Sequence, residues 1–205
     1  HFDIHCAIII VRKNMLLLLL LLFVFVSDLS AETFVFAESY RTFKKDEPYQ
    51  TNVVWAQKGF GKRFGAFGWG QYGKTYQQTY GGLYVKPTSW LQVGAGAGQE
   101  QWSKTPRLGS FAYAAKGKYY TFAIYENFGT TGYWYLVLTD RSISKSWSVG
   151  TQSQAFLGHG VRAEYRLKPV FGWAPSIRPA VLWDPKTGPR PNVILGLRLT
   201  YFKGE

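Results

Sequence analysis

Hydrophobic and polar residues alternate with a period of two along most of the chain after residue 31. The stretch GVRAEYRLK, residues 160–168, shows the pattern clearly, with apolar residues at its odd numbers and charged residues at its even numbers from 161 onward. Successive side chains of a strand point to opposite faces, so this stretch predicts a strand with one apolar and one charged face. No segment after residue 31 keeps a convincing 3.6-residue apolar period over three turns, which predicts an all-β chain.

The alternating segments are separated by clusters of Gly, Pro, Asp, Asn, Ser and Lys, which are typical of turns. The short KGFGK link leaves open whether the second and third segments form one strand, so the expected number is 12 within a range of 10–14. The predicted strands are 33–43, 51–58, 63–73, 75–86, 90–100, 108–117, 119–127, 131–140, 146–154, 158–168, 176–184 and 192–202.

The N-terminal part of the chain differs from the rest. An apolar block, MLLLLLLLFVFV at residues 15–26, precedes SDLSAE. A block of this length with a small-residue exit is typical of a secretory signal peptide, and we predict cleavage after Ala31. Residues 1–10 do not fit such a peptide and are interpreted as upstream read-through. A retained N-terminal anchor is the alternative, although a spanning helix needs about 20 residues. The expected division is therefore 1–31, upstream residues and signal peptide, and 32–205, one β-domain.

Two observations bear on whether the apolar residues at alternate positions of each segment face lipid or a packed core. In NVILGLRLTYF and WLQVGAGAGQE almost every second residue is apolar, so one face of each strand is apolar, which also occurs in soluble sandwiches. Tryptophans, however, gather near the ends of the predicted strands, as they do in the aromatic girdles of membrane barrels. The tryptophans expected at the two membrane interfaces are Trp90, Trp102, Trp134, Trp147, Trp173 and Trp183.

Taken together, these features resemble those of bacterial outer-membrane β-barrel proteins. The resemblance is carried by the signal-like block, the alternating strands of about ten residues and the closing strand VILGLRLTYF, in which Phe202 fills the near-terminal aromatic position. It implies an antiparallel up-and-down transmembrane barrel, export to the outer membrane and insertion by the barrel-assembly machinery. Residues 203–205 extend beyond Phe202 and depart from the usual pattern. An even number of strands would place both termini in the periplasm.

Composition adds the question of charge. The chain has 205 residues, 46% of them hydrophobic, and a formal net charge of +12. Such a charge attracts polyanions, including anionic lipid headgroups and acidic solutes. Nucleic acid is not expected as a partner, because the chain carries an export signal and its tryptophans mark segment ends.

If lipid covers the apolar parity of residues 160–168, the charged parity lines the bore, because an Arg at the lipid midplane costs about 2–4 kcal/mol. Antiparallel neighbours bring further arginines to the same wall, with Glu164 as the only acid expected nearby. A basic strip favours anions, whereas paired charges would only keep strands in register. The residues predicted to line the bore are Arg162, Glu164, Arg166, Lys168, Arg178 and Arg198. The row Gly94, Gly96 and Gly98 either leaves room for solute or lets the wall curve.

The function predicted is thus a small anion-favouring pore or a structural barrel. The alternatives are an outer-membrane hydrolase acting on lipid and a secreted soluble β-barrel binding protein. Catalysis is not favoured, since His159 is the only histidine after the signal and its nearest serine, Ser153, lies across the loop AFLG. No cofactor or metal site is expected. Predicted partners are outer-membrane lipid, a small anionic solute, and lipopolysaccharide, whose phosphates would meet loop residues Lys44, Lys45, Lys104, Arg107, Lys186 and Arg190.

Overall fold

The computed structural model describes residues 32–43, 48–74, 76–101, 105–129, 132–186 and 189–203. These residues form a closed barrel of antiparallel strands, and the prediction of twelve strands is confirmed, with the second and third separate. The signal peptide expected within residues 1–31 lies outside the described residues, as does Trp102. The strands are β1 (Thr33–Phe43), β2 (Tyr49–Phe60), β3 (Phe64–Gly73), β4 (Gln77–Thr88), β5 (Leu91–Glu100), β6 (Arg107–Lys116), β7 (Tyr119–Phe128), β8 (Trp134–Ser142), β9 (Trp147–Gln154), β10 (Gly158–Arg166), β11 (Trp173–Trp183) and β12 (Asn192–Lys203).

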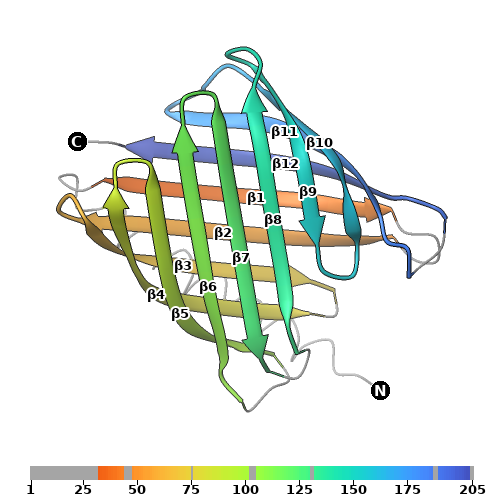
Figure 1. Cartoon of the computed structure of the whole chain (residues 1–205), viewed down its shortest axis with the longest axis horizontal. Helices are drawn as coiled ribbons and strands as arrows, with labels where there is room; N and C mark the ends of the chain where they lie inside the picture. The colour runs from red at the N-terminus through yellow and green to blue at the C-terminus, as the bar shows by residue number, and fades with distance from the viewer. Residues whose placement is uncertain are drawn as a thin grey trace.

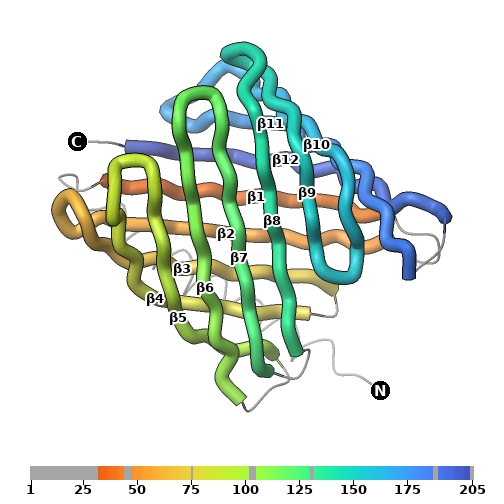
Figure 2. Tube along the Cα trace, viewed as in Figure 1, coloured from red at the N-terminus to blue at the C-terminus, as the bar shows by residue number. Residues whose placement is uncertain are grey.

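Each strand pairs with its neighbours in sequence, and β1 closes the barrel against β12. Closure leaves no strand edge unpaired, which is how a sheet satisfies its backbone groups in lipid. The first residue of β1 pairs with the last of β12, so both ends of the barrel chain lie at one end of the molecule (Figures 1 and 2). We call this the terminal end and the opposite one the far end.

The strands are steeply tilted, so that the wall formed by β5–β9 crosses in front of the wall formed by β12 and β1–β3 (Figure 1). Strand β11 has 11 residues and a tryptophan at each end, Trp173 and Trp183. With a rise of about 3.3 Å per residue and a tilt of about 40°, it spans about 25 Å along the barrel axis. This is the height of the apolar band of a transmembrane barrel.

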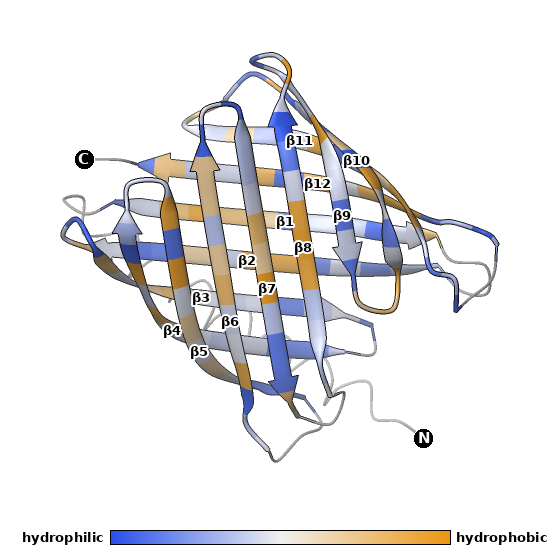
Figure 3. Ribbon diagram, viewed as in Figure 1, coloured by the Kyte–Doolittle hydropathy of each residue, from blue (hydrophilic) through white to orange (hydrophobic). Residues whose placement is uncertain are grey.

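The outward face of the barrel is apolar over much of its height. In β12 the outward side chains Leu195, Leu197 and Leu199 are 47%, 60% and 47% exposed, while Arg198 between them points inward. Figure 3 shows hydrophobic colour on the central parts of several strands and hydrophilic colour at many of the turns. A soluble barrel would bury its leucines inside, so this sorting is that of a barrel surrounded by lipid. Within the described part of the chain, no helix has the length and apolarity to cross a membrane.

The row of glycines in β5 faces inward but does not leave free space. A Cβ atom on Gly94 would lie 2.2 Å from the Phe111 ring. Cβ atoms on Gly96 and Gly98 would lie 2.4 Å and 1.9 Å from backbone carbonyl oxygens of β4. Of the two roles left open by the sequence, the structure therefore assigns the close approach of packed groups along a sharply curved wall.

Candidate functional site: the bore of the barrel

One half of the bore, beside β2–β7, is filled by aromatic rings. Trp55, only 2% exposed, stacks with Phe67 at a centroid distance of 5.2 Å. From the facing strands, Phe111 and Phe122 meet the same indole edge to face, at 4.9 Å and 5.5 Å. These inward aromatics alternate with outward residues along their strands. From the sequence, only tryptophans near strand ends were considered, so an aromatic cluster in the bore was not predicted. Any passage through the barrel is thus confined to the other half.

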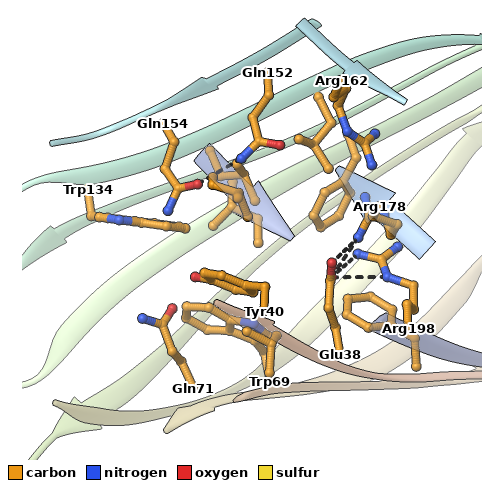
Figure 4. A pocket seen from close by; sticks show the side chains of 17 residues that line it. Glu38, Tyr40, Trp69, Gln71, Trp134, Gln152, Gln154, Arg162, Arg178 and Arg198 are labelled. Atoms are coloured by element: carbon orange, nitrogen blue, oxygen red, sulfur yellow. Dashed lines mark hydrogen bonds and ion pairs between the residues drawn. The ribbon is translucent and has the colours of Figure 1, made fainter. Parts of the chain in front are cut away.

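That other half contains a cavity of about 60 Å³, which has room for about four water molecules. Its wall combines guanidinium groups, side-chain amides and aromatic rings, which Figure 4 shows facing one another across the bore. The polar and aromatic residues around it are Glu38, Tyr40, Trp69, Gln71, Trp134, Gln152, Gln154, Arg162, Arg178 and Arg198.

Glu38 lies at the centre of the charged part of this cavity. Arg178 Nη1 donates to both of its carboxylate oxygens at 2.6 Å. Arg198 donates to Glu38 Oε2 from Nη2 at 2.6 Å and from Nε at 3.1 Å (Figure 4). The Arg198 guanidinium also lies 4.0 Å from the centroid of the Phe36 ring, within cation–π distance. One carboxylate therefore holds two arginines from neighbouring strands.

Further ion pairs continue along the wall of β7–β11. Arg162 is hydrogen-bonded to Asp140, and both side chains are almost fully buried. Glu164 accepts hydrogen bonds from Tyr120 at 3.0 Å and from Ser176 at 2.9 Å. The expectation that Glu164 is the only acid near the basic strip is therefore wrong. Closure of the barrel places Glu38 of β1 against β12, and the strand register places Asp140 of β8 and Arg162 of β10 opposite the same residue of β9, Gly150.

A second charged cluster lies nearer the far end. Arg107 donates from Nε to Glu126 at 2.9 Å, and its Nη1 lies 3.4 Å from Glu100. All three side chains are 1–2% exposed. The prediction that Arg107 lies in an outer loop and meets lipopolysaccharide is wrong, since this residue begins β6 and points into the bore. Two adjacent carboxylates provide the partners that a buried guanidinium requires.

The structure brings most of the predicted bore residues together. Arg162, Glu164, Arg166, Arg178 and Arg198 share the inward parity of β10–β12, and Arg166 is hydrogen-bonded to Ser148. Lys168 does not belong with them, because β10 ends at Arg166 and Lys168 is exposed in the following turn.

The predicted interface tryptophans separate into two groups. Trp134 points into the bore, with its ring centroid 6.1 Å from that of Trp69, so its expected place in an outer girdle is wrong. Trp147 and Trp173 are exposed at strand ends and pack on outward tyrosines of neighbouring strands. The remaining members, Trp90 and Trp183, are 44% and 46% exposed. Among the loop lysines predicted to meet lipopolysaccharide, Lys44, Lys45 and Lys104 lie outside the described residues.

The described charges inside the bore balance in number. The five inward arginines equal the five inward acids in number, so the positive excess of the described residues lies outside the bore. Among the described residues, no three His, Cys, Asp or Glu side chains are grouped to hold a metal ion. The inward charges are Arg107, Arg162, Arg166, Arg178 and Arg198 with Glu38, Glu100, Glu126, Asp140 and Glu164.

On the outward face near the far end, the Nδ1 atom of His159 lies 2.7 Å from the Ser153 hydroxyl. The two residues are directly opposite in the β9–β10 pair. From the sequence, Ser153 was the nearest serine but not at the spacing typical of lipid hydrolases, and the β9–β10 hairpin brings these residues, six apart, into direct contact. Among the described residues, no carboxylate is hydrogen-bonded to the imidazole to orient it.

A closed twelve-strand barrel with an apolar outer face and a charged bore defines a small porin-like protein of the bacterial outer membrane. The same fold occurs in the solved KdgM porin, with 11% identity and a TM-score of 0.51 over 81% of this chain and 98% of that one. The NanC porin superposes with 10% identity and a TM-score of 0.50 over 82% of this chain and 100% of that one. No protein-family model matches the chain, and no curated protein matches it in sequence.

Proposed function

We propose that this protein is a small selective channel for acidic solutes, in which Arg178 and Arg198 bind the anionic group of the solute. The observation that carries the proposal is the lining of the cavity, where three arginines face one carboxylate, Glu38. A guanidinium binds a carboxylate through parallel hydrogen bonds, so a solute carboxylate can replace Glu38 in the same geometry.

The size of the cavity adds a condition to this function. About 60 Å³ holds a few water molecules, so a solute passes only when side chains of the bore move. Displacing Glu38 from its two arginines is one such movement, because Glu38 lies at the cavity wall between Arg178 and Arg198. The amides of Gln71, Gln152 and Gln154 then offer hydrogen-bonding groups for hydroxyls.

A solved structure of similar fold supports this solute class. It is described as the KdgM porin in complex with disordered oligogalacturonate, and it shares 11% identity and a TM-score of 0.52 with this chain. Galacturonate combines a carboxylate with hydroxyls, the two kinds of group that the cavity lining can bind. We infer that acidic saccharides are the first solutes to test here.

The test is single-channel recording of the folded barrel in planar bilayers under a salt gradient. The wild type is expected to favour chloride and to be blocked by an acidic oligosaccharide but not by a neutral one. Arg178→Gln with Arg198→Gln should shift the reversal potential toward cations and abolish the block. Lys74→Gln, at the exposed far end, is the control and should change neither. An unchanged reversal potential in the double variant would leave these arginines a structural role only.

The contact between Ser153 and His159 favours a second candidate, hydrolysis of membrane lipid. A serine hydroxyl bonded to an imidazole is the minimal arrangement for nucleophilic attack on an ester, and both residues face lipid. Release of fatty acid from vesicles that is lost in Ser153→Ala and in His159→Ala would establish this activity. Equal release by both variants and the wild type would exclude this pair as its source.

A further inference from the structure

The positive excess of the chain is concentrated at the terminal end of the barrel. Basic residues occupy the turns and strand ends there, and most of them are exposed. Among the described residues at this end, Glu32 forms an ion pair with Lys86, while the acids Asp140 and Glu164 point into the bore. The basic residues of this rim are Lys58, Lys62, Arg63, Lys86, Lys116, Lys118, Arg141, Lys145, Lys168 and Lys203. The excess is smaller at the far end, where the described basic residues outside the bore are Arg41, Lys74, Lys186 and Arg190, together with Asp184.

The strand register shows that the central part of this rim faces outward and not into the bore. Lys116 pairs with Tyr119 across β6 and β7, and Tyr119 pairs with Arg141 across β7 and β8. Their parity is opposite to that of the inward residues Phe111 and Asp140 on the same strands. The three side chains therefore form one row on the outer surface, and this row cannot act by lining the passage.

The row has the composition of a headgroup site. The Arg141 guanidinium lies 5.6 Å from the centroid of the Tyr119 ring, which is 57% exposed. Neighbouring strands are about 4.8 Å apart, so Lys116 and Arg141 start about 10 Å from each other on either side of this ring. Lys118 and Lys145, exposed in the adjacent turns, add two more cations. A tyrosine at the membrane interface lies at the level of the lipid headgroups, and the cations on either side of it surround the position that a lipid phosphate would occupy.

We propose that this rim binds anionic phospholipid of the leaflet at the terminal end, with Lys116, Tyr119 and Arg141 as the central site and Lys118 and Lys145 at its border. Clusters of Lys and Arg beside a membrane-spanning segment bind anionic headgroups, and each residue contributes about fivefold in binding, which corresponds to about 1 kcal/mol. Charge complementarity selects this partner: the rim combines many cations with aromatic girdle residues, its acid Glu32 is paired with Lys86, and the acids Asp140 and Glu164 at this end are bonded inside the bore. This assignment does not depend on what the bore conducts.

The experiment uses the folded mature barrel in vesicles of equal parts phosphatidylcholine and phosphatidylglycerol. After gentle extraction, native mass spectrometry counts which lipids stay bound. The wild type is expected to retain phosphatidylglycerol in clear excess. A variant in which Lys116, Lys118, Arg141 and Lys145 are each replaced by Gln should lose this excess by at least about fivefold. The matched control, Lys74→Gln with Lys186→Gln and Arg190→Gln at the far end, should keep it.

Two further measurements keep the proposal falsifiable if the rim variant folds poorly. Replacing Lys116, Lys118 and Lys145 by Arg preserves the charge and should preserve the excess of bound phosphatidylglycerol. In the wild type, rising salt should reduce that excess, because the sites are exposed and screened. The proposal is overturned if the wild type retains both lipids equally, or if the rim and control variants lose the excess alike. Equal retention would also direct attention to an acidic protein as the partner of this end.

Discussion

Replacing Glu38 by Gln is the most informative single change in the bore. Its carboxylate is 12% exposed and accepts four hydrogen bonds from Arg178 and Arg198, which are 6% and 17% exposed. Removing one partner of a buried ion pair costs about 3–5 kcal/mol, because the opposite charge stays buried and unpaired. Glutamine keeps one acceptor oxygen and Arg198 is partly exposed, so we expect the free energy of unfolding to fall by about 3 kcal/mol.

The assay is urea unfolding of the barrel in lipid vesicles, followed by tryptophan fluorescence. Glu32→Gln is the matched control, since Glu32 and Lys86 are 35% and 22% exposed and a surface pair contributes at most about 1 kcal/mol. In bilayers, Glu38→Gln should also increase the preference for anions, because the two arginines lose their counterion. A loss of stability no greater than that of Glu32→Gln, or a shift toward cations, would refute the role assigned to Glu38.

Three other changes test the packing of the barrel. Gly82→Ala would place a Cβ 2.2 Å from a backbone carbonyl oxygen and should reduce the yield of folded, heat-modifiable barrel, whereas Gly68→Ala, with its nearest atom at 3.8 Å, should not. Leu197→Arg on the outward face should cost about 2–4 kcal/mol in vesicle unfolding, and a cost near zero would mean that this face does not meet lipid. Phe111→Ala removes a ring 4.9 Å from that of Trp55 and should cost about 3–5 kcal/mol while raising conductance; unchanged conductance would show that the aromatic half does not limit flow.

The aromatic and charged halves of the bore show how side chains of the wall fill most of the interior of a twelve-strand barrel. Barrels of 8 strands are filled by side chains, and those of 16–18 strands enclose water. With 12 strands, this barrel fills one half with the rings packed on Trp55 and leaves a small polar space beside Glu38. The ion pairs that border this space also join strands far apart in sequence, so the side chains proposed to bind solute also hold the wall together.

The period-two alternation by itself predicted an all-β chain of about twelve strands, within a range of 10–14, and the face that many of the central residues present. The reason is that side chains on a strand alternate strictly, and lipid accepts only one of the two parities. From this, Arg162, Arg178 and Arg198 could be assigned to the bore and the leucines of β12 to the outer face. Residues at the ends of strands could not be assigned in this way. Lys168 lies in the turn after β10 and not in the bore, and Trp134 at the start of β8 points into the bore and not toward lipid.

Only the tertiary structure decided which charges meet. Glu38 and Arg198 are 160 residues apart in sequence, and they become neighbours because the first strand closes against the last. Arg107 looked like a loop residue until the barrel placed it between two carboxylates, and Ser153 met His159 only through the register of a hairpin. Register and closure are set by the whole sheet, so no local pattern contains them. The distribution of charge also required the tertiary structure. The net charge can be counted from the sequence, but its division between a balanced bore and a basic rim depends on where each strand ends.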